Sequence, residues 1–186
     1  MNGIAFNSYY KLQNDTSFVV YTNEPILPAE GFFVRSVAGD LNFNATAKNA
    51  ATNAYVRLVL YEAEKMHDRA YLKTTEGEGL GKMEKGRPSA TLYFRQDDGD
   101  YAIAVRKDGI AEYQLGFQTI YNGTFTITTD LMEAECGYLH LIDQLTGEDI
   151  DLLSKPSYTF EARTTDNANR FKLVLSNSED ANGFGK

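Results

Sequence analysis

The clearest hydrophobic pattern in the chain lies near its C-terminal end. In residues 157–163, the apolar Tyr158, Phe160 and Ala162 alternate with polar residues, and residues 170–175 repeat the alternation. A period of two places one face of a strand in a core and the other face in water. The inward positions predicted in this way for residues 110–176 are Leu115, Phe117, Phe125, Ile127, Leu139, Leu141, Tyr158, Phe160, Phe171 and Leu173.

Two connections in the same region contain residue types that favour turns. Gln144-Leu145-Thr146-Gly147 suits a type I turn in which Gly147 is left-handed and forms a bulge that closes a hairpin. Asp166 precedes Asn167–Asn169, and this order predicts one short helical turn with Asp166 as its N-cap.

The preceding part of the chain also predicts strands, separated by a glycine-rich surface loop at residues 76–86. The longest is Ala54–Glu64, where Val56, Leu58 and Leu60 share one face; a helix ending in YEAEKMHD is the rival interpretation. The other predicted strands cover residues 17–22, 31–37, 41–46, 68–74, 89–95 and 101–106.

These patterns predict an all-β protein built from two antiparallel β-sandwich domains. Residues 109–176 show about six strands at spacings near ten residues, which is typical of an immunoglobulin-like sandwich. Residues 1–108 predict a second β-sandwich of jelly-roll type, and residues 177–186 a polar tail or linker. The alternative is one continuous sandwich, in which the strand at residues 110–117 is shared by both halves.

Composition narrows the possible classes. The 12 Tyr and 11 Phe favour pleated, half-buried surfaces. A net charge of −8 argues against nucleic acid as a partner, because a phosphate backbone attracts a basic face. No apolar run approaches the ~20 residues that membrane insertion needs. The single cysteine excludes an intramolecular disulfide.

The C-terminal phrases also carry a family resemblance. YLHLID-x-LTG-x-DIDLL, PSYTFEA-x-TTD and RFKLVLS resemble a module found near the C-termini of large secreted or surface proteins of Bacteroidetes, just upstream of a type IX secretion sorting domain. The resemblance is specific over Asn122–Ser176 and weaker over Asn14–Phe33 and Tyr55–Gly81. It implies an extracellular or cell-surface location, neighbouring domains in a longer parent chain, and that this sequence is an internal fragment.

Two short patterns suggest chemistry that their context does not support. Gly77–Lys82 (GEGLGK) lacks the glycine and the Ser or Thr that a P-loop needs, since Glu76 and Met83 occupy those positions. Cys136 and His140 lie four residues apart at the start of a strand, where they do not meet, and no third group orients the histidine. We expect His140 to be an outward residue beside Tyr138, and we expect no catalytic residue.

Metal binding has one weak candidate. With two histidines, one of them in the His67-Asp68 pair, and one cysteine, a zinc site of four His and Cys ligands cannot be built. Calcium prefers oxygen ligands, and Asp97, Asp98 and Asp100 surround Gly99. Asp and Gly are common turn residues, so this cluster favours a turn over a calcium site. We therefore expect no cofactor and keep this loop as a weak calcium candidate.

The sequence favours a non-catalytic structural or adhesin-like module over an enzyme. The alternative is a carbohydrate-binding module, because exposed aromatic rings stack on sugars. The chain has no Trp, and Tyr9, Tyr10, Tyr61 and Tyr71 are the rings that could serve in its place. The expected partner is an extracellular glycan or protein.

Overall fold

The two-residue alternation corresponds to real strands, and most of them pair into one large sheet. The computed structural model describes residues 8–13, 17–22, 24, 32–34, 54–83, 90–107 and 112–177. These residues form no helix, and they therefore contain no helix that is long and apolar enough to cross a membrane. The strands are β1 Ser8–Gln13, β2 Ser17–Thr22, β3 Tyr55–Glu62, β4 Lys65–Lys73, β5 Leu80–Gly81, β6 Thr91–Gln96, β7 Gly99–Val105, β8 Glu112–Gln118, β9 Gly123–Met132, β10 Tyr138–Asp143, β11 Glu148–Asp151, β12 Ser157–Ala162 and β13 Phe171–Ser176.

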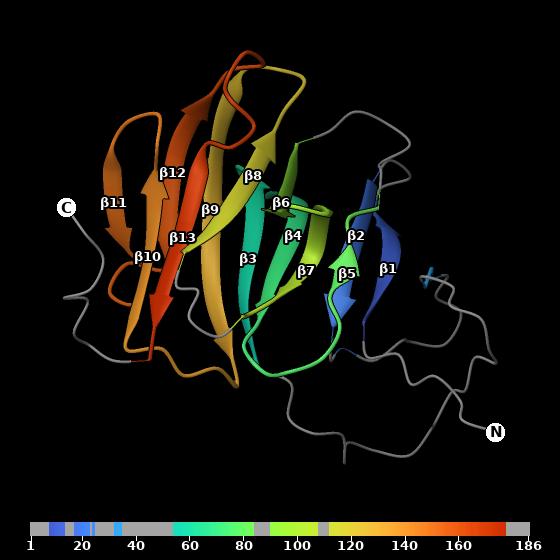
Figure 1. Cartoon of the computed structure of the whole chain (residues 1–186). Coiled ribbons are helices and arrows are strands. Elements are labelled where there is room, and N and C mark those ends of the chain that lie inside the picture. Colours follow the sequence, from blue (N-terminus) through green and yellow to red (C-terminus); the bar gives the residue numbers. More distant parts are fainter. Residues whose placement is uncertain are drawn as a thin grey trace, which may run out of the picture.

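The large sheet has 11 strands and is nearly closed (Figure 1). Its order is β11-β10-β13-β8-β6-β7-β4-β3-β9-β12, with β5 paired to β7. Neighbouring strands are antiparallel except β4 and β7, which pair in parallel. The sheet bends back on itself, so its two end strands, β11 and β12, lie on the same side of the molecule.

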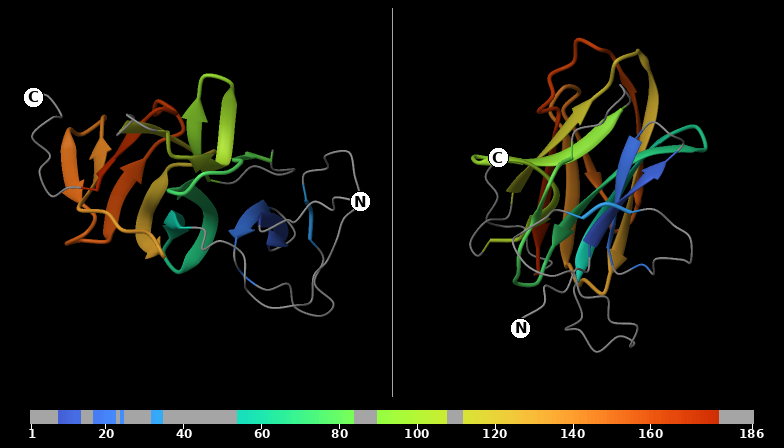
Figure 2. Two further views of the ribbon diagram at one scale, coloured as in Figure 1. Left: turned by 60° about the horizontal axis from the view of Figure 1, so that its bottom comes forward. Right: turned by 90° about the vertical axis from the view of Figure 1, so that its right-hand side faces the viewer.

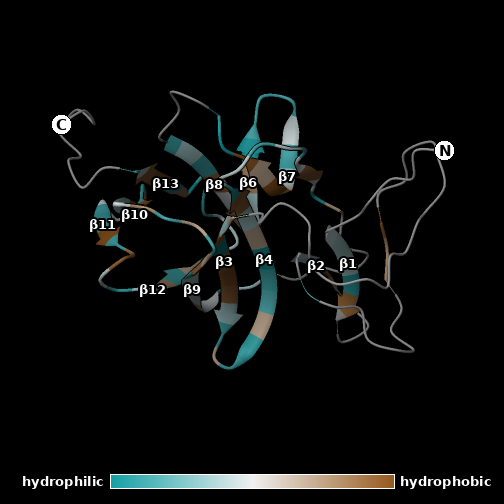
Figure 3. Cartoon of the chain, turned by 90° about the horizontal axis from the view of Figure 1, so that it is seen from below, coloured by the Kyte–Doolittle hydropathy of each residue, from teal (hydrophilic) through white to brown (hydrophobic). Residues whose placement is uncertain are grey.

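The main core fills the space between the two layers of this bent sheet. The ring of Phe117 on β8 lies 5.3 Å from Phe125 on β9, 5.1 Å from Phe160 on β12 and 6.2 Å from Phe171 on β13, between ring centroids. All ten inward positions predicted from the alternation are buried. In Figure 3 the hydrophobic colour lies on strands such as β3 and β6, and the hydrophilic colour lies at the tip of the β6–β7 hairpin.

A second, smaller core lies on the outer face of the sheet. The hairpin of β1 and β2 stands beside β4 (Figure 2) and buries Tyr10 and Val20 against Tyr55, Tyr71 and Ile103. The rings of Tyr55 and Tyr71 meet edge to face at 5.8 Å. The hairpin therefore buries the Tyr55 end of the outer face of β3, while Val56, Leu58 and Leu60 on its inner face lie in the main core. The strand interpretation of Ala54–Glu64 is therefore confirmed, and the helix interpretation is wrong.

Strands from both sides of the predicted domain boundary, between residues 108 and 109, belong to one sheet. The alternation predicts a separate sandwich for residues 1–108, whereas β3, β4, β6 and β7 pair into the same sheet as β8–β13. β8 pairs with β6 on one side and β13 on the other, and β9 lies between β3 and β12. This pairing is the one expected of a single continuous sheet. Separate folding of the two halves, and the immunoglobulin-like arrangement, stay predictions.

The remaining predictions differ in outcome. The glycine-rich segment at residues 76–86 is not only a surface loop, because Leu80 and Gly81 pair with β7 as β5. The predicted strands at residues 31–37 and 41–46 lie outside the described residues, except for 32–34, where Phe33 pairs with Tyr10. The polar tail also lies outside them after residue 177.

Candidate binding groove beside strand β12

An open groove of about 740 Å³ lies between β12 and the β10–β11 turn. Because consecutive side chains of a strand point to opposite faces, a hollow lined by every residue from 158 to 162 follows the edge of β12 and not one of its faces. The groove is lined by Asn122, Gly123, Thr124, Leu145, Thr146, Glu148, Tyr158, Thr159, Phe160, Glu161, Ala162, Arg163, Asp166 and Arg170.

The edge of β12 that faces the groove carries main-chain hydrogen-bonding groups. Thr129 N donates to Pro156 O at 2.8 Å, so the even-numbered residues of β12 are the ones that bond to β9. Ser157, Thr159 and Glu161 therefore direct their N–H and C=O groups away from β9. We call this side of β12 the open edge, since no strand in the described part of the chain pairs with it.

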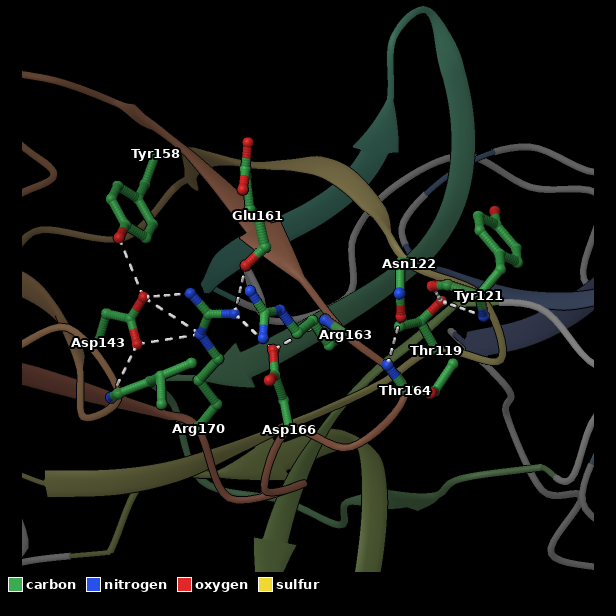
Figure 4. Close-up of polar contacts among 11 residues, drawn as sticks. Thr119, Tyr121, Asn122, Asp143, Tyr158, Glu161, Arg163, Thr164, Asp166 and Arg170 are labelled. Carbon is green, nitrogen blue, oxygen red and sulfur yellow. Dashed lines mark hydrogen bonds and ion pairs between the residues drawn. The ribbon is translucent and has the colours of Figure 1, made fainter.

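The floor of the groove holds a buried ion pair between Arg170 and Asp143 (Figure 4). Arg170 is 2% exposed and Asp143 is fully buried. Arg170 Nη2 donates to Asp143 Oδ2 at 2.7 Å, and Nε lies 3.0 Å from Oδ1. Tyr158 Oη donates to Asp143 Oδ2 at 3.0 Å. The third nitrogen of Arg170, Nη1, donates to Glu161 O at 2.7 Å and to Asp166 Oδ2 at 3.0 Å.

The β10–β11 turn orients Asp143. Its Oδ1 accepts a hydrogen bond from Leu145 N at 3.0 Å, and its main-chain oxygen accepts one from Gly147 N at 2.8 Å. Gly147 has a φ of 78°, which confirms the predicted left-handed conformation. The turn chemistry seen in the sequence thus fixes the carboxylate that holds Arg170.

The loop before β13 does not form the predicted helical turn at Asn167–Asn169. Asp166 Oδ2 accepts hydrogen bonds from Arg163 N and Arg170 Nη1, both at 3.0 Å, so its carboxylate is not directed at a helix. Asn169 N donates to Asn167 Oδ1 at 2.9 Å. This side-chain bond offers the backbone an alternative to a helical turn. The N-cap role predicted for Asp166 is therefore wrong.

The charges of this cluster are fixed at neutral pH. Burial acts to raise the pKa of the Asp143 carboxyl, but hydrogen bonds from Arg170, Leu145 N and Tyr158 outweigh it and hold that pKa below its usual range. Burial acts to lower the pKa of Arg170, and its bonds to Asp143 more than offset this. Burial raises the pKa of Tyr158 to about 12. The ion pair therefore stays charged and the phenol stays neutral, which suits a structural cluster better than proton transfer.

The sequence analysis missed Asp143, Arg170 and Asp166 as members of one site. One signal was present: Asp143 continues the inward series of Leu139 and Leu141, and a carboxylate at an inward strand position needs a partner. Arg170 lies 27 residues further along the chain, and no local pattern connects the two.

The predicted site residues have other partners. His140 stacks on Tyr138 at 3.9 Å between ring centroids, and its Nδ1 lies 2.7 Å from Asp149 Oδ1. This confirms its predicted place beside Tyr138. Burial raises the pKa of the Cys136 thiol, which packs half-buried against the main core. A raised pKa disfavours the reactive thiolate.

The adjacent residues His67 and Asp68 face different partners. His67 Nε2 lies 3.2 Å from Glu62 Oε2, which also accepts a hydrogen bond from Tyr121 Oη at 2.9 Å. Asp68 forms a buried ion pair with Lys82 at 2.8 Å. Lys82 is the lysine of the GEGLGK segment, so its amine is engaged inside the protein.

The aspartates of the weak calcium candidate are not grouped around a common centre. Asp100 pairs with Arg95 at 2.9 Å, and Asp98 Oδ2 accepts a hydrogen bond from Tyr101 at 2.7 Å. Over the described ranges, no three His, Cys, Asp or Glu residues lie close enough to hold a metal ion. Calcium binding by Asp97, Asp98 and Asp100 stays a prediction.

The four tyrosines considered for sugar stacking do not form an exposed platform. Tyr9, Tyr10 and Tyr71 are buried, and Tyr61 is half-buried. They pack the small hairpin against the sheet or lie along it, as half-buried strand tyrosines usually do.

Comparison of the chain with protein-family models, with curated proteins and with solved structures gives no match.

Proposed function

We propose that the chain is a non-catalytic β-sandwich module of a bacterial cell-surface or secreted protein, structural or adhesin-like in role. In this proposal it sits among neighbouring domains of a longer parent chain and binds an extracellular protein through the groove beside β12. The proposed location and the longer parent chain are based on the sequence resemblance to Bacteroidetes surface proteins over Asn122–Ser176.

The observation that carries the proposal is the state of the charged groups in the groove. Asp143, Arg170, Asp166 and Tyr158 bond to one another, and the shifted pKa values of Asp143, Arg170 and Tyr158 keep these three groups in one protonation state near neutral pH. A general acid or base needs a pKa near the working pH and a reach toward substrate. These groups instead hold three chain segments together and leave a main-chain edge exposed beside them.

Two measurements test this proposal. Antibodies raised against the purified chain should label intact cells of the producing organism, with a cytoplasmic protein as the negative control. Labelling that appears only after lysis would contradict the location. The purified chain should also leave ester, peptide and glycoside substrates unchanged, and turnover that is lost in an Arg170 variant with an intact fold would contradict the non-catalytic role.

A carbohydrate-binding module is the second candidate, and one observation favours it. Tyr138 and His140 stack in parallel on the outer face of β10, next to the exposed Asp149. Aromatic rings and carboxylates on a sheet face suit sugar hydroxyls and C–H groups. A glycan array tests it: binding that Tyr138→Ala abolishes and Leu145→Ala leaves intact would favour this candidate over the first.

A further inference from the structure

We propose that the groove binds an extended segment of a partner protein, which adds a strand to the open edge of β12. This inference rests on the proposed function as a binding module and names the partner class of the same site. In strand addition, main-chain hydrogen bonds supply affinity, and side chains on alternate positions supply specificity.

The open edge offers a defined set of main-chain groups. Ser157, just before the residues that line the groove, directs its N–H and C=O to this side of β12. Thr159 directs an N–H and a C=O into the groove, and Glu161 directs an N–H. The next two groups are already occupied, because Arg170 donates to Glu161 O and Asp166 accepts from Arg163 N. An added strand therefore pairs with residues 157–161 and stops there. Five residues at ~3.3 Å each make a segment of about 17 Å.

The other end strand of the sheet is protected against such pairing. β11 has four residues, and three of them, Glu148, Asp149 and Asp151, are acidic. Short edge strands with charged side chains are how native sheets resist edge-to-edge contact. β12 is longer, and Glu161 is its one charged residue. The groove also follows β12 along its length.

The groove lining indicates the chemistry of the partner. Glu148 and Glu161 are exposed carboxylates in this lining, and Arg163 is its one exposed cation. The positive charge of Arg170 is already neutralised by Asp143 and Asp166, so the exposed charge of the lining is net negative. A strand laid beside β12 also places alternate side chains next to Tyr158 and Phe160, which face the core. The best-matched segment alternates Lys or Arg with apolar residues such as Val.

A second copy of this chain matches the edge less well. Each copy carries a net charge of −8, so two copies repel one another. Pairing of two β12 strands about Thr159 would also need Glu161 O, which Arg170 occupies.

The experiment uses the full chain and three synthetic seven-residue peptides. The first alternates Lys and Val, the second alternates Glu and Val, and the third repeats the first with N-methylated amides on the edge that would face β12. Binding is measured by titration calorimetry, and amide hydrogen exchange is followed by NMR. We expect the Lys–Val peptide alone to bind and to slow exchange at Ser157, Thr159 and Glu161. Tyr158 and Phe160 should change little, because their amides already bond to β9.

Matched variants separate strand addition from contact by side chains. Proline is tolerated on an edge strand where its N–H would point outward, so Thr159→Pro should keep the fold and remove one outward donor. We expect Thr159→Pro to weaken binding about tenfold or more, as loss of one good hydrogen bond does. Thr159→Ala loses the same hydroxyl and should bind nearly as the parent chain. Glu161→Gln should weaken binding of the Lys–Val peptide and make it less sensitive to salt.

Three results would overturn the inference. The first is failure of the Lys–Val peptide to bind, and the second is equal binding by folded Thr159→Pro and Thr159→Ala. The third is a concentration-dependent dimer that Thr159→Pro abolishes, which would make a second copy the occupant. None of these results bears on surface labelling of cells or on inertness toward substrates, so failure here would remove protein binding through the groove and leave the surface location and the non-catalytic role to their own tests.

Discussion

Arg170 Nη1 donates a 2.7 Å hydrogen bond to Glu161 O, a main-chain oxygen on the open edge of β12 (Figure 4). Its other nitrogens hold Asp143 at the end of β10. One side chain therefore links β12, one end strand of the sheet, to β10, which lies next to the other end strand, β11. A guanidinium suits this position because its donors form a rigid fork.

Removing Arg170 should be strongly destabilising. Arg170→Ala leaves the Asp143 carboxylate buried without its main partner, and we expect a loss of about 3–5 kcal/mol in the free energy of unfolding. Urea unfolding measures it. Arg163→Ala, an exposed neighbour, is the control and should stay within about 0.5 kcal/mol. Equal effects of the two substitutions would contradict a stabilising bridge.

The cluster predicts a pH profile of stability with losses at both extremes. The pKa of Asp143 is lower in the folded state than the ~3.9 of an unfolded aspartate, so its contribution is present above about pH 4 and is lost as the pH falls through the folded value. The pKa of Tyr158 is raised to about 12, so its contribution is present below about pH 10 and is lost between about pH 10 and 12.

Tyr158→Phe tests the alkaline limb, with the free energy of unfolding measured from pH 8 to 12. The variant should lose about 1–3 kcal/mol at neutral pH, since a hydrogen bond to a carboxylate is removed. Its stability should then fall less than that of the parent chain between pH 10 and 12. Tyr121, whose pKa is also raised to about 12, should still contribute there. An unchanged alkaline slope would contradict the role of Tyr158.

Gly147 should tolerate Asn better than Val. A Cβ at this position meets nothing within 4 Å, so any cost comes from its φ of 78° and not from crowding. A β-branched residue in this region costs on the order of 1–3 kcal/mol, whereas Asn adopts it readily. Thermal unfolding of Gly147→Val and Gly147→Asn compares them, and equal losses would mean that the turn relaxes to another conformation.

The aromatic core should be sensitive to truncation at Phe160 and Phe171. Their rings lie 4.8 Å apart and are at most 4% exposed. Replacing either with Ala should cost roughly 3–5 kcal/mol in urea unfolding. The outward neighbours Glu161 and Lys172 are the controls and should change stability by about 0.5 kcal/mol or less when replaced by Ala. Large losses at the outward positions would contradict the assigned faces.

Expression of residues 109–176 alone tests whether the chain folds as one unit or as two. The two-domain interpretation predicts a cooperative melt and resistance to protease. The shared sheet predicts the opposite, because β8 and β9 would each lose the strand on one side, and the core would lose Leu58, Leu60 and Phe94. We expect a non-cooperative melt by circular dichroism, with the intact chain as control. A cooperative melt would support separate domains.

The sequence by itself determined the inward faces of the strands in residues 110–176. Period-two alternation marks which side chains enter a core, and all ten inward positions predicted for residues 110–176 are buried. The turn sequence also predicted the left-handed conformation of Gly147, because glycine is the residue type that such a position favours. It failed at Asp166, where a partner four residues away, Arg170, competes with the cap.

Only the tertiary structure decided which strands are neighbours, and with them the groove. Pairing of β3 with β9 joins residues some seventy positions apart, and alternation contains no information about which edge meets which. The same holds for Asp143 and Arg170: the alternation places Asp143 inward but does not indicate its partner, and the two meet because the bend brings β10, β12 and the start of β13 together. The open edge of β12 exists because the sheet ends there, a property of the whole fold that no single segment carries.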